Sequence, residues 1–175
     1  TIIYIMKDFS HKEIFTTKID LPISKINRNI DDILVREIKH KNGNTCNENG
    51  YIFENSIQLL NRSTGELSAI NNTSSISFIV KYSADIITPI IGEKYKCLVE
   101  ETSKMGILAY IRDGEQYNNV DESPLLIIIP APVLENQNLS INDFKKGDSL
   151  KIVVEAVRIK YHNKQIQVIA KIDEA

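Results

Sequence analysis

Cysteine and tryptophan are scarce in this chain of 175 residues, which has two cysteines and no tryptophan. Cys46 and Cys97 lie far apart, with no Cys-x-x-Cys pair and no histidine at metal-ligand spacing. Two cysteines are too few for a disulfide framework. We therefore expect reduced thiols in a cytosolic compartment and no metal site.

An excess of charge of either sign is also missing, since the net charge is −2. Residues 1–88 carry 10 basic and 10 acidic side chains, and residues 89–175 carry 11 and 13. A protein that binds nucleic acid mainly through its overall field should be distinctly basic. No apolar run approaches the roughly 18 residues of a membrane span, and the first residues lack the basic region and cleavage site of a signal peptide. We expect no membrane partner.

The sequence lacks the motifs of common enzymes. His11, His40 and His162 do not stand beside a serine or cysteine nucleophile in a recognisable signature, and no glycine-rich phosphate loop occurs. The acidic pairs 31–32 and 100–101 are adjacent in sequence, so their side chains point to different faces of a helix or strand. We expect no catalytic residues and no cofactor.

The pattern of residues 1–88 predicts an α+β domain. Alternating apolar residues over 15–21 indicate a half-buried strand that ends at Pro22. Helical spacing from Ile26 to Ile38 predicts one helix of about 12–14 residues, capped by Asn27 or Asn29 and stopped by Gly43. Strands are expected at 51–60, 66–71 and 75–82. The helix should cover one face of an antiparallel sheet.

The pattern of residues 89–175 predicts an all-β domain. Strands are expected at 94–101, 106–112, 124–130, 149–160 and 165–172, with a long connection over 131–148. Five strands with this spacing are typical of a small closed barrel of the OB type. The apolar run 125–129 is expected to be a buried central strand or, alternatively, a docking strip. The expected domains are 1–88 and 89–175.

Several short motifs follow one another in an order that suggests a family. They are Cys-x-x-x-Gly-Tyr-Ile from Cys46, Val-Lys-Tyr at 80–82 and Pro-x-x-Gly-Glu from Pro89. In this order and spacing the chain resembles the stalk subunits of multi-subunit RNA polymerases, the family that includes the archaeal stalk protein and the seventh subunit of eukaryotic RNA polymerase II. The 30 isoleucines and 16 asparagines have AT-rich codons and suit a large DNA virus or an AT-rich protist.

The resemblance implies a truncated ribonucleoprotein-like domain followed by an OB barrel. In this family a helix and a glycine-containing loop dock at the base of the polymerase clamp. The matching segments are the helix near 29–39 and the segment 44–51. The implied docking residues are Asn44, Thr45, Cys46, Gly50 and Tyr51. On composition alone the same loop would be only a surface connection. The implied partners are the large subunits of an RNA polymerase core and, in cellular enzymes, a second stalk subunit.

The barrel of this family lies near the RNA exit channel and contacts nascent single-stranded RNA. Such contact needs cations and aromatic faces. The candidates are Lys94, Tyr95, Lys96, Tyr110, Arg112, Arg158, Lys160, Tyr161 and Lys164. Because the barrel segment is net acidic, binding should be weak and salt-sensitive. A simpler alternative is a solvated strand edge protected from aggregation by lysine.

The expected function is therefore a non-catalytic stalk subunit of a DNA-directed RNA polymerase that guides the exiting transcript. For a viral protein the expected locations are the host cytoplasm and the virion, and for a cellular one the nucleus. A free-standing OB-fold RNA-binding protein, such as a translation factor, is the alternative. A virion structural protein is a third hypothesis, and it predicts self-association.

Overall fold

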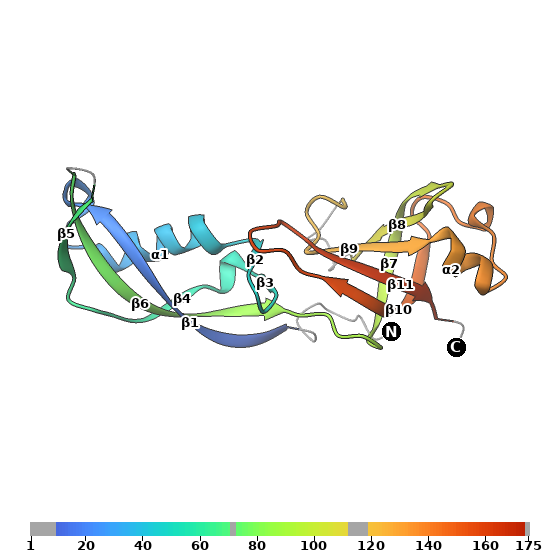
Figure 1. Cartoon of the computed structure of the whole chain (residues 1–175), viewed down its shortest axis with the longest axis horizontal. Coiled ribbons are helices and arrows are strands. Elements are labelled where there is room, and N and C mark those ends of the chain that lie inside the picture. Colours follow the sequence, from blue (N-terminus) through green and yellow to red (C-terminus); the bar gives the residue numbers. More distant parts are fainter. Residues whose placement is uncertain (1–9, 71–72, 112–118, 174–175) are drawn as a thin grey trace. The chain divides into compact units, whose positions relative to one another are not determined.

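The computed structural model describes residues 10–70, 73–111 and 119–173 (Figure 1). Two compact units are found. The N-terminal unit comprises His11–Asn44 and Ile52–Ile86, and the barrel unit comprises Thr45–Tyr51 and Ile87–Ala175. Residues 45–51, which we expected to belong to the N-terminal domain, thus group with the barrel. The division into domains 1–88 and 89–175 remains a prediction.

One helix covers a sheet in the N-terminal unit. Strands β1 (Ser10–Pro22), β4 (Gln58–Arg62) and β5 (Glu66–Ile70) all pair with the long β6 (Thr73–Ile87). Helix α1 (Ile30–Asn42) buries Leu34 and Ile38 against the sheet. Each such side chain contributes about 1.5–3 kcal/mol of burial. The remaining core residues come mainly from the sheet. They are Ile19, Leu21, Ile52, Ile57, Phe78, Val80, Tyr82, Ala84 and Ile86.

Gly43, the residue after α1, is required for a different reason than expected. Gly43 is the residue after the helix, as the sequence predicted, but its φ is −71°, which any residue can adopt. A Cβ atom at Gly43 would lie 2.5 Å from the carbonyl oxygen of Lys39 and 2.7 Å from Cγ of Glu54. Close packing therefore requires this glycine. The left-handed conformation after the helix falls instead on Asn44, with φ 50°.

The expected strand over 51–60 is wrong, because the structure divides it. Strand β3 (Tyr51–Ile52) is followed by a 3-10 turn (Glu54–Ser56), and only then does β4 begin. Ser56 causes the break: its hydroxyl donates to the carbonyl oxygen of Phe53 at 2.6 Å and accepts from the amide of Asp85 at 2.7 Å. A local side-chain hydrogen bond has replaced part of the sheet ladder.

A closed five-stranded barrel forms most of the other unit, consistent with the predicted OB type. Its order is β10-β11-β9-β8-β7, and β10 also pairs with β7. All pairs are antiparallel except β9 with β11. The bounds match the expected strands closely: β7 (Lys94–Ser103), β8 (Gly106–Tyr110), β9 (Leu125–Pro130), β10 (Ser149–Arg158) and β11 (Ile166–Ile172). The ribonucleoprotein-like description of the first domain remains a prediction.

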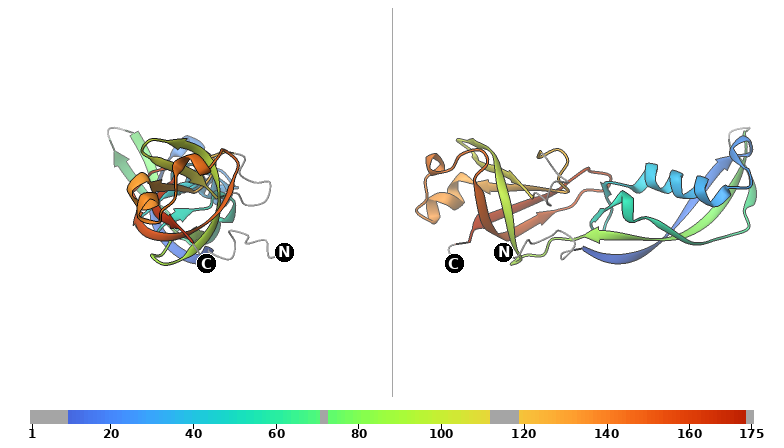
Figure 2. Two further views of the ribbon diagram at one scale, coloured as in Figure 1. Left: turned by 90° about the vertical axis from the view of Figure 1, so that its right-hand side faces the viewer. Right: turned by 180° about the vertical axis from the view of Figure 1, so that it is seen from behind.

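The apolar run 125–129 is a buried strand of this barrel. Leu125, Ile127 and Ile129 are fully buried, and Leu126 and Ile128 are half-buried. The connection that follows contains a helix that the sequence did not predict, α2 (Ala131–Asn136), which begins after Pro130 and carries a proline in its first turn. Leu134 of α2 is fully buried. The helix lies at the end of the barrel that faces the viewer in the left view of Figure 2.

Candidate nucleic-acid interface

The turn between β10 and β11 presents cations and an aromatic ring to solvent. We define residues 158–164 (Arg-Ile-Lys-Tyr-His-Asn-Lys) as the cationic turn; it contains no acidic residue. Arg158, Lys160 and Lys164 are exposed, and the side chain of Tyr161 is 61% exposed. The Tyr161 ring contacts the His162 ring edge-on at 4.1 Å between centroids. Cations beside an open aromatic face are the elements that bind single-stranded nucleic acid.

Hydrogen bonds fix the shape of this turn. His162 has φ 63°, and the amide of Asn163 donates to the carbonyl oxygen of Lys160 at 3.1 Å. At its base, Nε2 of Gln165 donates to the carbonyl oxygen of Ser123 at 2.8 Å. A turn held in one conformation loses less entropy when it binds a ligand.

The expected docking loop is tied to the cationic turn. We use the name docking loop for residues 45–50, which follow Asn44. The amide of Cys46 donates to the carbonyl oxygen of Asn163 at 2.7 Å, and the amide of His162 donates to the carbonyl oxygen of Cys46 at 2.8 Å. From the sequence we predicted two separate sites, whereas in the structure the docking loop and the cationic turn are hydrogen-bonded to each other. No local signal could reveal this pairing, because the segments are more than a hundred residues apart.

Most of the expected docking residues are inaccessible to a partner. Cys46, Gly50 and Tyr51 are buried and Thr45 is half-buried. Asn44 is exposed, but its side chain pairs with Glu54, donating to the carboxylate at 3.0 Å and accepting from the backbone amide at 3.2 Å.

The exposed tip of the docking loop is formed by Glu48 and Asn49, which lie within the predicted docking segment 44–51 but were not among the implied docking residues. Oδ1 of Asn47 supports this tip by accepting from the amides of Asn49 at 2.8 Å and Gly50 at 2.9 Å. The polar, asparagine-rich composition of this segment was the sequence signal that its tip is exposed.

The expected RNA-binding residues divide into separate groups. Arg158, Lys160, Tyr161 and Lys164 lie together in the cationic turn. Lys94 and Lys96 are exposed on β7, where Lys96 lies opposite Lys151 of β10. Arg158 comes seven positions after Lys151 on β10. The distance along the strand is roughly 23 Å at about 3.3 Å per residue. Arg112 lies outside the described residues.

Two expected stacking residues are buried instead. The side chain of Tyr95 is 4% exposed, and its hydroxyl donates to Oε2 of Glu93 at 2.6 Å. Burial, with the Glu93 carboxylate beside the hydroxyl, raises the pKa of Tyr95 above its ordinary value. Tyr110 is 7% exposed. The faces of both rings are inaccessible to bases. The alternation of Tyr95 with Cys97 and Val99 was a signal that it points inward.

The two buried thiols should make the stability of the protein depend on pH. Burial raises the pKa of Cys46 to about 11 and that of Cys97 to about 12. The unfolded chain loses these protons near its ordinary thiol pKa, so the free energy of unfolding should fall as pH rises from about 9 through the folded-state values. Urea unfolding on both sides of pH 9 measures this. In a control with Cys46→Ala and Cys97→Ala, this part of the fall should be absent; an equal fall would contradict the assignment.

Comparison with known proteins adds one similarity. No protein-family model matches this chain. The chain is similar to a protein of Acanthamoeba polyphaga mimivirus. That protein is named "Putative DNA-directed RNA polymerase subunit". The two are 24% identical over 160 residues, which cover 89% of this chain and 77% of the mimivirus protein. The similarity supports the interpretation that this chain is an RNA polymerase subunit. It does not distinguish the stalk subunit from others, so the stalk assignment remains a prediction.

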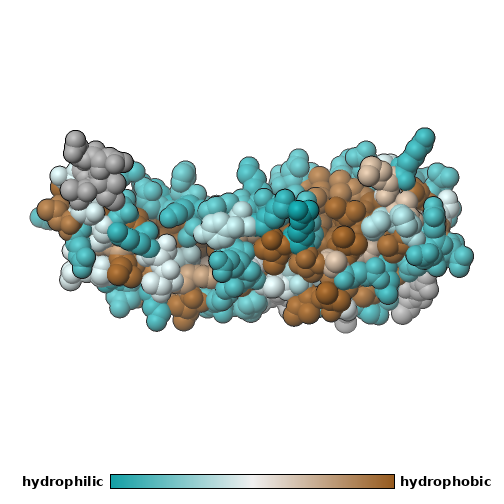
Figure 3. Space-filling model, viewed as in Figure 1, coloured by the Kyte–Doolittle hydropathy of each residue, from teal (hydrophilic) through white to brown (hydrophobic). Residues whose placement is uncertain are grey.

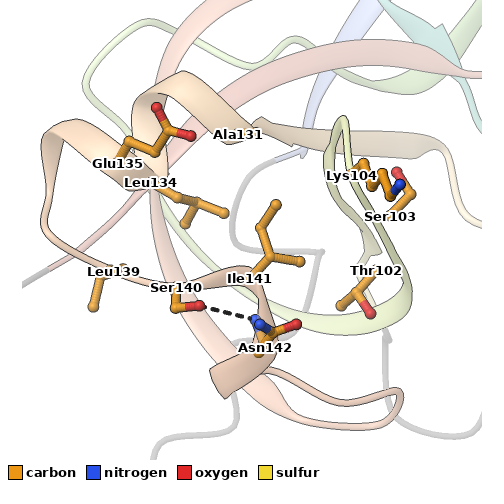
Figure 4. Close-up of a pocket in the computed structure, with 10 residues that line it drawn as sticks. All are labelled: Thr102, Ser103, Lys104, Ala131, Leu134, Glu135, Leu139, Ser140, Ile141 and Asn142. Carbon is orange, nitrogen blue, oxygen red and sulfur yellow. Dashed lines mark hydrogen bonds between the residues drawn. The ribbon is translucent and has the colours of Figure 1, made fainter.

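The barrel unit also contains a pocket at its α2 end. This pocket, of about 660 Å³, lies between the β7–β8 turn, α2 and the segment around Ile141 (Figure 4). Lys104 and Glu135 are its only titratable side chains, and they lie on opposite sides of it.

Metal-binding groups and membrane-spanning helices are absent from the described residues. They contain no group of three His, Cys, Asp or Glu side chains that could hold a metal ion. In the same part of the chain, no helix is long and apolar enough to span a membrane.

Proposed function

We propose that this chain is a non-catalytic stalk subunit of a DNA-directed RNA polymerase, encoded by a large DNA virus. Its docking loop contacts the large subunits of the core near the clamp, and its cationic turn contacts the exiting transcript. The observation that carries the proposal is the exposed cationic turn of an OB-type barrel, hydrogen-bonded through Asn163 and His162 to the docking loop. The similarity to the mimivirus protein supports the polymerase assignment.

Weak RNA contact is sufficient for such a subunit. The net charge of −2 gives no strong overall attraction to RNA. A polymerase that holds both the subunit and its transcript raises the local concentration of RNA at the turn, so low affinity is compensated by tethering. The subunit would act in the host cytoplasm and in the virion. A second stalk subunit would be an additional partner.

Affinity purification tests this proposal. The tagged chain, expressed in the cells that make it naturally, should recover the large polymerase subunits, identified by mass spectrometry. The isolated chain should bind single-stranded RNA weakly. If instead no polymerase subunit is recovered and the isolated chain binds RNA tightly, the protein is a free-standing RNA-binding protein. Self-association measured by light scattering, without polymerase, would indicate a virion structural protein.

The tip of the docking loop provides a prediction for assembly. Because the Glu48 side chain is exposed at this tip, Glu48→Arg should reverse a charge at the interface without changing stability. We expect several-fold lower recovery of polymerase subunits. Glu101→Arg, at an exposed position of β7, is the matched control and should retain normal recovery. Equal recovery by both variants would place the interface elsewhere.

A further inference from the structure

Two lysines face each other on the outer surface of the barrel. Lys96 of β7 and Lys151 of β10 are directly paired across the antiparallel strands, and both are exposed. The Cβ atoms of directly opposite residues are about 4.5–5.5 Å apart, and like charges at this distance destabilise the pair. Lys151 was not predicted from the sequence, because cross-strand pairing depends on register and not on local sequence.

Nearby lysines have anionic partners, unlike this pair. Nζ of Lys94 lies 2.9 Å from the Asp173 carboxylate, and Nζ of Lys171 lies 3.2 Å from the Glu155 carboxylate. Within the described parts of the chain, neither Lys96 nor Lys151 has a carboxylate oxygen within 4.0 Å. Asp173 and Glu155 are thus already paired with Lys94 and Lys171. Among the described residues, this position therefore carries two lysine charges without a carboxylate in ion-pair contact.

A β-bulge places Arg158 on the same face as this pair. In a regular strand, residues seven apart point to opposite faces. The β10–β11 register pairs Val154 with Ala170 and Ala156 with Ile169, which leaves Glu155 as an extra residue. After this bulge the alternation is reversed. Lys151 before it and Arg158 after it are both exposed on the outer face.

We propose that single-stranded RNA continues from the cationic turn along the outer face of β10, and that Lys96 and Lys151 together bind its phosphodiester backbone. This inference rests on the proposed contact between the turn and the transcript. The path from Arg158 to Lys151 is roughly 23 Å long at about 3.3 Å per residue. A path of this length suits a short RNA segment, as expected for an OB barrel, which covers roughly 4–16 nucleotides. A phosphate between the two lysines removes the repulsion that the free protein carries.

The surface between the two ends also suits an extended strand. Val153, Ala156 and Ile169 are half-buried or exposed there, and they provide apolar surface beside the cations. Figure 3 shows hydrophobic residues gathered on the barrel among hydrophilic ones. Glu155 is the acidic side chain of the bulge, and Lys171 neutralises it.

The test combines RNA affinity with stability in the full-length chain. The variant Lys96→Gln/Lys151→Gln is titrated against a single-stranded RNA of about 12 nucleotides over a range of salt concentrations. Loss of two phosphate contacts should weaken binding and lower the slope of log affinity against log salt by about 1.4. Because the repulsion is relieved, the melting temperature should stay the same or rise. Lys104→Gln/Lys145→Gln removes two exposed lysines elsewhere on the barrel unit and should change neither the affinity nor the slope.

The outcomes separate this inference from the proposed function. If substitutions in the cationic turn weaken binding but Lys96→Gln/Lys151→Gln leaves the salt slope unchanged, the path along β10 is wrong and the turn contact stands. If neither set of substitutions has an effect, both proposals fail. Weaker binding accompanied by a lower melting temperature would also contradict the inference, because the lysine pair would then support folding.

Discussion

Replacing Gly50 by alanine should destabilise the folded chain by about 3 kcal/mol, through steric overlap and backbone strain together. Gly50 has φ 155°, which side-chain-bearing residues rarely adopt. An added Cβ would lie 2.6 Å from Oγ1 of Thr88 and even closer to the carbonyl oxygen of Ile87. Thr88 itself donates to the carbonyl oxygen of Asn49, so it cannot move without breaking this bond. Urea unfolding of the variant measures the loss.

Gly92→Ala is the matched control, because Gly92 has φ 91° but no atom within 4 Å of an added Cβ. It should cost only the backbone strain, about 1–2 kcal/mol. Equal losses in the two variants would show that crowding at Gly50 is unimportant. The result also changes the role first expected for this residue: poorer polymerase recovery with Gly50→Ala would reflect unfolding of the docking loop and not loss of a contact.

Neutralising the cationic turn should have the largest effect on RNA binding. In the variant Arg158→Gln/Lys160→Gln/Lys164→Gln, three exposed cations are lost from a turn without acidic residues. The slope of log affinity against log salt should fall by about 2, and affinity at low salt should fall by about tenfold to hundredfold. Fluorescence anisotropy with labelled single-stranded RNA measures both quantities. Polymerase recovery should be unchanged, because the docking loop is intact.

A matched triple variant, Lys12→Gln/Lys104→Gln/Lys145→Gln, removes the same charge from exposed positions outside the turn. Comparable loss of affinity in both variants would mean that RNA senses only the net charge, and the turn would have no special role. Unchanged affinity in the turn variant would exclude the turn as the contact.

Local periodicity was sufficient to predict the barrel and the main helix. Strands β7, β9 and β11 alternate between more buried and less buried residues over most of their length, and α1 repeats its apolar residues at helical spacing. The errors arose where a local hydrogen bond or a proline competed with that pattern. Ser56 divides the expected strand over 51–60, and the short α2 starts after Pro130 inside an expected loop.

The candidate site was predictable where it is local in sequence. The cations and Tyr161 of the cationic turn are neighbours in the chain, so composition revealed them. The burial of Tyr110 could not be predicted from the sequence, because it depends on closure of the barrel. Lys151 and the link between Cys46 and Asn163 were missed because they depend on strand register and long-range pairing.

Site-specific photocrosslinking in a transcribing polymerase tests the central claim most directly. Tyr161, exposed in the cationic turn, is replaced by a photoreactive phenylalanine derivative, and the tagged chain is purified with its polymerase and a labelled transcript. We expect a crosslink between residue 161 and the nascent RNA in a complex that contains the large polymerase subunits. A polymerase complex whose RNA does not crosslink at this position, or crosslinked RNA without polymerase subunits, would contradict the proposed role.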